Sequence, residues 1–205
     1  MGEQSLGDQR SPQSRRNALV SRLESMSDLQ YPIILDRAGI EAVLPHRGPM
    51  LFIRNLVALS DRQFRGEAHW DADHPLLRGH FPACPIVPGV MLVEAAAQLT
   101  GAGLLAADPV ARSIGPGHVG MLTAIRKCFF KRPVRPQDSV RLELCCRRMG
   151  EKAVVASGTA CIDGDEAALI EILVTHVPAG QLEPFLPRSA LDAIARNTRT
   201  PSAGA

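Results

Sequence analysis

Aromatic residues are scarce in this sequence of 205 residues: they make up 4% of it, with one tryptophan and one tyrosine. Any hydrophobic core must therefore be mostly aliphatic. A large charge of one sign is also lacking, because 23 Lys and Arg against 21 Asp and Glu leave a formal net charge of +2. This balance argues against a strongly basic nucleic-acid-binding protein. Hydrophobic residues reach 45%, which excludes wholesale disorder.

Cysteine motifs are absent as well. The five cysteines include no Cys-x-x-Cys pair and no two pairs at zinc spacing, so we interpret them as reduced structural thiols. The N-terminus shows no short apolar run of a secretory signal, and its arginines are offset by acidic residues, unlike a transit peptide. We therefore expect a cytoplasmic protein.

One apolar stretch, residues 89–107, is long enough to suggest a membrane-spanning helix. Glu94 lies inside it, and a carboxylate near the centre of a bilayer costs about 2.5–3.5 kcal/mol. Gln98, Thr100 and three glycines weaken the case further. We predict a helix buried in protein and no membrane span.

The composition divides the chain into three parts. Residues 1–30 are polar and predict a flexible N-terminal arm, with a weak helix over about 15–26. Residues 31–178 show firm patterning and predict one folded domain. Residues 179–205, rich in proline and small residues, predict a C-terminal tail.

Within the central part, the pattern predicts a short helix over 37–44 and a long helix from 89 to about 108. Strands are predicted over 51–58, 64–70, 119–125, 128–130, 140–148, 154–162 and 168–177. Because strands and helices do not alternate, a parallel doubly wound sheet is disfavoured. A helix that is apolar on every side must be covered on most sides. The predicted class is therefore α+β, an antiparallel sheet wrapped around one long central helix.

A proline-rich segment before the long helix holds the first candidate catalytic residue, His80. Residues 79–98 read G-H-F-P-A-C-P-I-V-P-G-V-M-L-V-E-A-A-A-Q. Three prolines between His80 and the helix stiffen the backbone, which would hold the imidazole in one place. Pro88 suits the first helical turn. The N–H of the next residue, Gly89, is then unpaired and, with no side chain beside it, leaves room for an acyl oxygen.

Glu94, on the long helix, is the second candidate. Gln98 follows one turn later, so the two side chains share a face and Gln98 can orient the carboxyl group. Desolvation is expected to raise the pKa of Glu94, as a general acid requires. A single buried His or Glu is more often structural than catalytic. The combination of a rigid His, a helix-start N–H and a Glu–Gln pair favours catalysis.

Residues 79–98 resemble the signature of β-hydroxyacyl-acyl carrier protein dehydratases of the FabZ type, G-H-F-P-x-x-P-x-x-P-G-V followed by E-A-x-A-Q. Residues 44–47 (L-P-H-R) resemble the opening motif of that family, and residues 130–138 (F-K-R-P-V-R-P-Q-D) resemble its F-x-x-P-V-x-P-G-D loop. The resemblance covers about residues 33–177. The FabZ type is preferred because Glu94 stands where the related FabA isomerase group has Asp. Gln137 departs from the family, in which glycine is common at this position.

This resemblance implies a hot-dog fold and a homodimer whose active sites each take the His from one subunit and the Glu from the other. A hexamer built as a trimer of dimers is a further arrangement. His80 would take the α-proton of a (3R)-3-hydroxyacyl thioester, and Glu94, held by Gln98, would protonate the departing hydroxyl as water. The Gly89 N–H would stabilise the enolate-like oxygen, and the Ile86 carbonyl would steer His80. No metal or redox cofactor is needed.

A basic run surrounds the third motif: Arg126, Lys127, Lys131, Arg132 and Arg135. One interpretation is a solvated strand edge. The functional interpretation is a landing surface for acidic acyl carrier protein and the phosphate of its 4'-phosphopantetheine arm. Nucleic acid is not an expected partner, because no binding motif surrounds the run.

The remaining histidines are interpreted as structural. His46 is expected at a strand entrance, where buried polar groups are normally satisfied. His74, His118 and His176 carry no motif that favours a functional role.

The sequence thus predicts a 3-hydroxyacyl-acyl carrier protein dehydratase, a hydro-lyase of fatty-acid or specialised acyl or polyketide biosynthesis. Two alternatives stay open. A hot-dog thioesterase would hydrolyse the thioester and keep the hydroxyl. A non-catalytic acyl-carrier-binding subunit of a dehydratase complex would lack turnover, and fold alone cannot separate the three.

Overall fold

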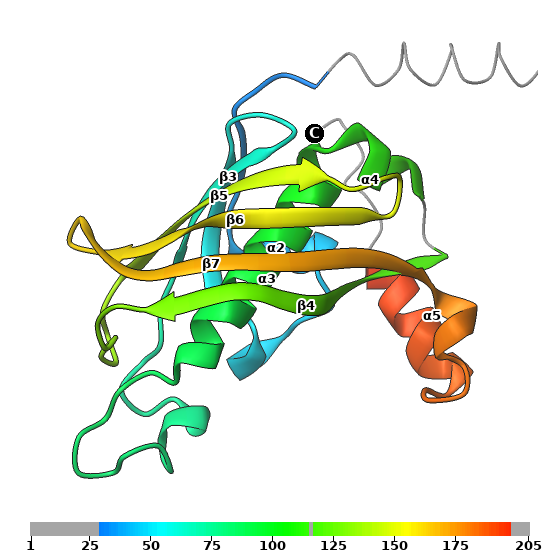
Figure 1. Ribbon diagram of the computed structural model, residues 1–205. Coiled ribbons are helices and arrows are strands. Elements are labelled where there is room, and N and C mark those ends of the chain that lie inside the picture. The colour runs from blue at the N-terminus through cyan, green and yellow to red at the C-terminus, as the bar shows by residue number, and fades with distance from the viewer. Residues whose placement is uncertain (1–28, 115–116, 198–205) are drawn as a thin grey trace, which may run out of the picture. The chain divides into compact units, whose positions relative to one another are not determined.

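The computed structural model describes residues 29–114 and 117–197 (Figure 1). The chain divides into a unit of residues 1–30 and a unit of residues 31–205, and the second holds the fold described here. The helix predicted over 15–26 lies outside the described residues.

A seven-stranded antiparallel sheet wraps around one long helix, α3 (Gly89–Ala107), which confirms the predicted class and the hot-dog fold. The strand order is β1-β2-β3-β5-β6-β7-β4. The strands are β1 (Ile33–Leu35), β2 (Ile53–Ala58), β3 (Gln63–Ala68), β4 (His118–Phe130), β5 (Val140–Arg148), β6 (Ala153–Ile162) and β7 (Asp165–Pro178). Two further helices are α2 (Arg37–Val43), which contacts β2 and α3, and α4 (Pro109–Ile114), which contacts α3.

Helix α3 is long and apolar enough to cross a membrane by length and composition, but most of it is buried inside the protein. It is the core helix that Glu94 and the glycines indicated. Its close approach to the sheet depends on small residues. A Cβ at Gly103 would lie 2.5 Å from the buried ring of Phe64 on β3, and a Cβ at Gly66 would lie 2.6 Å from Leu99 on α3. Bulkier residues at these positions would push helix and sheet apart.

The core is mainly aliphatic, as the composition predicts. Side chains on β3 alternate between buried and exposed, as expected when one face of a sheet covers a core. The few aromatic residues are nevertheless concentrated inside, because Trp70, Phe52 and Phe64 are the largest fully buried side chains.

The structure corrects several predicted elements. The two strands predicted over 119–125 and 128–130 are one strand, β4, whose register shifts twice against β7. Strand β1 and helix α4 were not predicted. Pro109 suggested only the end of α3. It also begins α4, where the Asp108 carboxylate accepts a hydrogen bond from the Ala111 N–H at 2.9 Å.

The segment predicted as a C-terminal tail also contains structure. After β7, a 3₁₀ turn (Ala179–Leu182) leads into helix α5 (Arg188–Asn197). This helix contacts α2 and β4, and its Leu191 is buried. The prolines before this helix led to the prediction of a tail, although residues 188–197 have a helical period of apolar residues.

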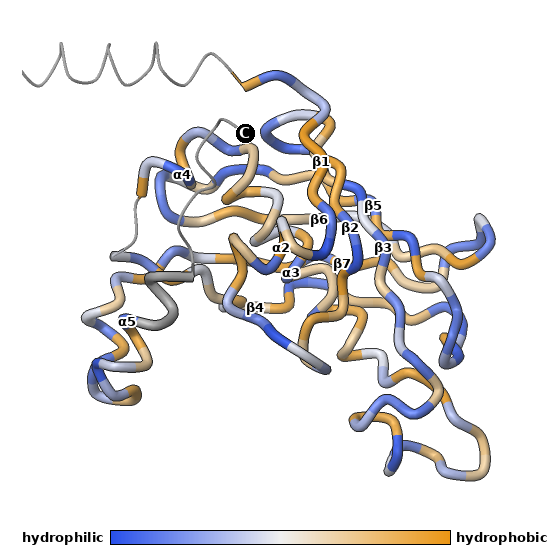
Figure 2. Tube along the Cα trace, turned by 180° about the vertical axis from the view of Figure 1, so that it is seen from behind, coloured by the Kyte–Doolittle hydropathy of each residue, from blue (hydrophilic) through white to orange (hydrophobic). Residues whose placement is uncertain are grey.

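The connection between β3 and α3 extends away from the sheet, and polar and apolar residues are mixed along it (Figures 1 and 2). It contains a 3₁₀ turn (Pro75–Leu77) and the proline-rich segment that precedes α3. This connection carries His80, so the first candidate residue lies on a loop and the second lies on the core helix.

Candidate active site

His80 is held at both its backbone and its ring. Its N–H donates to the Leu77 carbonyl at 3.1 Å, and its ring Nδ1 lies 3.0 Å from the Ile86 carbonyl oxygen. Because a carbonyl only accepts, Nδ1 carries the proton and Nε2 is the free basic nitrogen. The ring is half-buried, so Nε2 can meet a substrate.

The residue after His80 adopts a strained backbone. Phe81 has φ of 52°, in the left-handed region that a bulky residue rarely occupies. Its ring meets the His80 ring edge-on with centroids 4.4 Å apart, and 59% of it is exposed. The chain therefore turns directly after His80 through a backbone conformation that is unfavourable for phenylalanine.

Glu94 lies in a hydrogen-bond network centred on Gln98, which is almost fully buried. The Gln98 Nε2 donates to Glu94 Oε1 at 3.0 Å and to the Met50 carbonyl at 2.7 Å. The Gln98 Oε1 accepts from the Phe52 N–H at 2.9 Å. Every hydrogen-bonding role of the amide is thus set by main-chain groups and the carboxylate, which fixes the orientation of Glu94.

The second partner of Glu94 is His46, a residue that the sequence assigned to structure only. His46 Nε2 lies 3.3 Å from Glu94 Oε1. The Nδ1 of His46 is buried with no hydrogen-bond partner among the described residues, so Nε2 is the ring nitrogen that donates to Glu94. The motif L-P-H-R contained this residue, but no spacing in the sequence indicated that it approaches residue 94.

The expected rise in the pKa of Glu94 is wrong. Burial raises the pKa of this carboxyl and is the largest single effect. Hydrogen bonds from His46 and Gln98 and the electrostatic effect of His46 lower the pKa, and together they outweigh burial, so the net shift is downward. The sequence indicated the apolar helix and the donor Gln98, but not His46, which reaches the carboxyl from another segment. In the free protein Glu94 is a carboxylate at neutral pH.

Gly89 begins α3, and none of the hydrogen bonds among the described residues uses its N–H. The space beside it differs from the expectation of an open approach. A Cβ at Gly89 would lie 2.6 Å from the ring of Phe130, so the glycine also accommodates an aromatic ring from β4.

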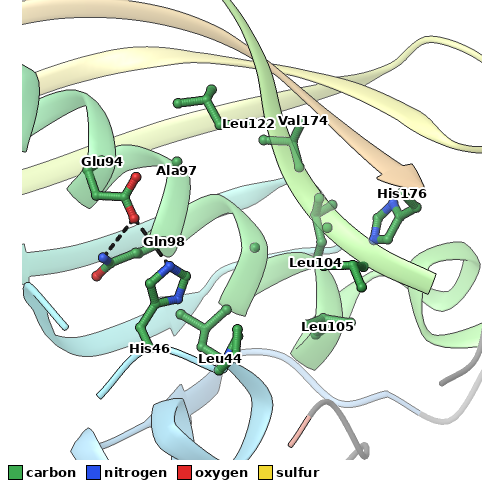
Figure 3. A pocket seen from close by; sticks show the side chains of 14 residues that line it. Leu44, His46, Glu94, Ala97, Gln98, Leu104, Leu105, Leu122, Val174 and His176 are labelled. Carbon is green, nitrogen blue, oxygen red and sulfur yellow. Dashed lines mark hydrogen bonds and ion pairs between the residues drawn. The ribbon is translucent and has the colours of Figure 1, made fainter. Parts of the chain in front are cut away.

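A cavity begins at the Glu94 carboxylate and runs along α3 (Figure 3). Figure 3 shows Glu94, Gln98 and His46 gathered at one end and His176 at the other. The cavity is lined between them mainly by apolar side chains: Leu44, Ala97, Leu104, Leu105, Leu122 and Val174. Such a channel suits an extended acyl chain.

His80 does not line this cavity, and no hydrogen bond or ion pair joins it to Glu94 within the described chain. The structure therefore orders each candidate separately, His80 by Ile86 and Glu94 by Gln98, and leaves the two unconnected in one chain.

Most of the basic run is paired with carboxylates of β7. Arg126 contacts Glu171 at 3.2 Å, Lys131 contacts Glu166 at 2.8 Å and Arg132 contacts Asp165 at 3.1 Å.

The other two basic residues differ. Lys127 lies 5.3 Å from the centre of the Phe129 ring. No acidic side chain of the described residues pairs with Arg135. The surface keeps less free positive charge than the sequence suggested.

The departure at position 137 has a visible consequence, because Gln137 adopts a φ of 73°. This conformation favours glycine, which the related motif has there. A separate question is metal binding. The described residues contain no group of three or more His, Cys, Asp or Glu that could hold a metal ion.

Comparison with known proteins places this geometry in a family. The FabA-like domain model matches residues 44–171. The FabZ 3-hydroxyacyl-(acyl-carrier-protein) dehydratase of Thermoanaerobacter sp. strain X514 is 34% identical over 147 residues, which are 71% of this chain and 100% of that protein. The FabZ protein of Alkalilimnicola ehrlichii is 38% identical over 133 residues, 64% of this chain and 84% of that protein.

Among solved structures, a chain of the ApeI:P dehydratase heterocomplex from Xenorhabdus doucetiae aligns with a TM-score of 0.59 at 16% identity. The alignment covers 78% of this chain and 99% of that chain, and at this identity it supports the fold alone. The family match spans the His80 loop, the Glu94 helix and most of the sheet. The chain therefore belongs to the FabA-like family, and its FabZ relatives are 3-hydroxyacyl-acyl carrier protein dehydratases.

Proposed function

We propose that the protein dehydrates (3R)-3-hydroxyacyl chains, carried by acyl carrier protein, to trans-2-enoyl chains in fatty-acid or specialised acyl biosynthesis. The observation that carries this proposal is the Glu94 carboxylate, oriented by a buried amide at the mouth of an apolar cavity. The His80 ring, with its free Nε2, supplies the complementary base.

The proposed reaction uses one base and one acid. His80 Nε2 takes the α-proton, the α,β double bond forms, and the bond from the β-carbon to the hydroxyl oxygen breaks as Glu94 gives that oxygen a proton. Water leaves and no other co-reactant is required. The free Gly89 N–H is suited to the thioester oxygen, where negative charge develops.

Glu94 must be protonated to act as an acid, yet its pKa is lowered in the free protein. An acyl chain that fills the cavity would remove the remaining water from the carboxyl, which is 29% exposed, and burial favours the neutral form. His46 Nε2 lies 3.3 Å from Glu94 Oε1 and lowers the pKa of that carboxyl. We therefore assign His46 as a positioning residue that tunes the acid.

A homodimer would bring the two candidates together. β4 is an end strand of the sheet, paired only with β7, and it is 13 residues long. Its exposed side chains are unusually apolar: Met121, Leu122, Ile125, Phe129 and Phe130. Long apolar edge strands pair with another chain unless something covers them. Pairing of two β4 strands about a two-fold axis would place the His80 loop of each subunit near the partner.

The proposed carrier partner is acidic, and the basic surface formed by the end of β4 and the residues that follow it is the proposed docking region. Because Arg126, Lys131 and Arg132 are already paired with carboxylates, we expect Lys127 and Arg135 to contribute most to charge steering.

The direct test is to incubate the protein with 3-hydroxydecanoyl-acyl carrier protein and follow the acyl product by mass spectrometry. Loss of one water with the wild type, and not with His80→Ala, supports the proposal. Release of free 3-hydroxy acid would instead indicate a thioesterase. Binding of the carrier with no reaction over several chain lengths would indicate an accessory subunit.

Mixing two inactive variants tests the shared site. His80→Ala and Glu94→Gln homodimers each lack one group in both sites. After subunit exchange, half of the dimers should be mixed, and each should contain one complete site, so about a quarter of the wild-type activity should return. No recovery after exchange verified by native mass spectrometry would contradict a site shared between subunits.

A further inference from the structure

A histidine on β7, His176, lines the end of the cavity opposite Glu94 (Figure 3). Every second residue of β7 points inward, and this row reads Ala168, Ile170, Ile172 and Val174 before it reaches position 176. The pattern predicts another aliphatic side chain there, because the row packs on the core. His176 is instead a polar group that is only 6% exposed.

The His176 ring has unused hydrogen-bonding capacity. Its Nδ1 is buried with no partner among the described residues. The other ring nitrogen, Nε2, lies beside Gly120, which also lines the cavity, and no hydrogen bond among the described residues uses it, so a ligand oxygen can bond there.

The surroundings keep this imidazole neutral. Burial lowers the pKa of His176 most strongly, and the charges of Arg148 and His118 lower it too. The main chain at Lys152 and the Asp108 carboxylate oppose this shift, without reversing it. The neighbouring Asp108 and Arg148 form a buried ion pair with each other, which leaves His176 as the neutral group at the cavity wall.

The strand opposite His176 places no side chain beside its Nε2. Gly120 on β4 is its direct register partner, and a Cβ at Gly120 would lie 4.0 Å from His176 Nε2. Paired residues of an antiparallel sheet point to the same face, so any larger side chain at position 120 would cover the imidazole. A glycine inside a strand weakens it and often marks a place where a ligand approaches closely.

The separation of the two polar ends sets the size of the ligand. The cavity wall on α3 runs from Glu94 to Leu105, a separation of eleven positions, or roughly 16 Å at 1.5 Å per residue. An extended chain advances about 1.2 Å per bond, so a chain of roughly a dozen atoms spans the distance.

We propose that His176 is a specificity-determining residue that binds an uncharged oxygen, such as a hydroxyl, at the distal end of the acyl chain. This inference rests on the proposed function, because it takes the cavity as the acyl site. A neutral imidazole offers one donor and one acceptor, which matches a hydroxyl group. A chain that ends in a methyl group would leave the imidazole buried and unpaired, and such sites reject analogues without the polar group.

Two kinds of ligand test the inference. The first is a set of matched unreactive acyl-pantetheine thioesters of ten, twelve and fourteen carbons, each with either a terminal methyl or a terminal hydroxyl group. Calorimetry should show that the wild type binds the hydroxyl member about tenfold more tightly at the length that reaches His176. In His176→Leu the preference should reverse, with tighter binding of the methyl member.

Gly120→Val provides a second variant that keeps the histidine and covers it. It should reduce the preference for the hydroxyl member while binding of the methyl member persists. His69→Leu, on a histidine that does not line the cavity, is the matched control and should keep the wild-type preference.

The second set is the corresponding 3-hydroxyacyl substrates, which separates the two proposals. Equal wild-type affinity for both ends at all three lengths would overturn the role of His176, whether or not dehydration occurs. Clear discrimination in binding with no dehydration of either substrate would support His176 and contradict the proposed reaction. A shift of the kcat/KM ratio between the two substrates in His176→Leu would support both.

Discussion

Replacement of Gln98 by leucine tests the network that orients Glu94. Leucine has a similar size and removes every hydrogen bond of the amide. The Phe52 N–H then loses its acceptor in a site where Phe52 is 2% exposed, and an unsatisfied buried N–H costs about 1–3 kcal/mol. The Met50 carbonyl and the Glu94 carboxylate are partly exposed, so water can replace the lost donor.

We therefore expect Gln98→Leu to lower the free energy of unfolding by about 2 kcal/mol, most of it from the single buried N–H. The melting temperature should fall by about 4–8 °C for a domain of this size. Urea unfolding at one fixed protein concentration measures the change, with an unaltered m-value as the sign that the native state is intact.

Gln63→Leu is the matched control, because Gln63 is exposed on β3 and its side chain has no hydrogen bond among the described residues. It should stay within about 0.5 kcal/mol of the wild type. Equal midpoints for Gln98→Leu and Gln63→Leu would refute the assignment of the buried amide as a structural element of the site.

Three further outcomes are expected. Gly103→Ala should destabilise the protein by about 1–3 kcal/mol in the same unfolding assay, because its Cβ would lie 2.5 Å from a buried ring. Gly101→Ala on the same helix is the control and should be tolerated, because the nearest atom to its Cβ would be 3.4 Å away. Equal effects of the two substitutions would contradict this packing. His46→Leu should raise the pKa of Glu94, because it removes a hydrogen bond and an electrostatic effect that lower it. The alkaline limb of the pH profile of kcat/KM should then move to higher pH, while the control His69→Leu should leave it in place. An unmoved limb in His46→Leu would argue against tuning by His46. The pKa of Glu94 in the folded protein is lowered from 4.5, so the ionised carboxylate stabilises the fold at pH above the unfolded-state pKa, and this contribution is lost as pH falls through the folded-state pKa. In Glu94→Gln the free energy of unfolding should therefore fall less steeply at acid pH. An unchanged acid dependence would contradict the lowered pKa.

Local patterns in the sequence determined much of the fold. The apolar run with one carboxylate predicted α3 as a buried core helix, and alternation of apolar and polar residues placed β5 and β6 to within one residue. Both signals arise from residues a few positions apart, which a single helix or strand brings onto one face. The pairing of Glu94 with Gln98 is local in the same sense.

Elements held by a few distant contacts were missed. Helix α5 has a helical period of apolar residues, but the prolines before it led to the prediction of a tail, and its contacts with α2 and β4 appear only in the fold. Strand β1 has only three residues and exists through its pairing with β2. The join of two predicted strands into β4 likewise depends on β7, whose register absorbs the irregular residues between them.

The sequence by itself indicated the candidate acid–base residues, because the motif around His80 and the Glu94–Gln98 spacing are continuous in the chain. Only the tertiary structure decided how these groups behave. His46 reaches Glu94 from 48 positions away and lowers its pKa, where local reasoning from burial predicted a rise. His176 lines the same cavity from a distant strand. Electrostatic and hydrogen-bond effects act through space, so their sign depends on neighbours that only the folded chain brings together.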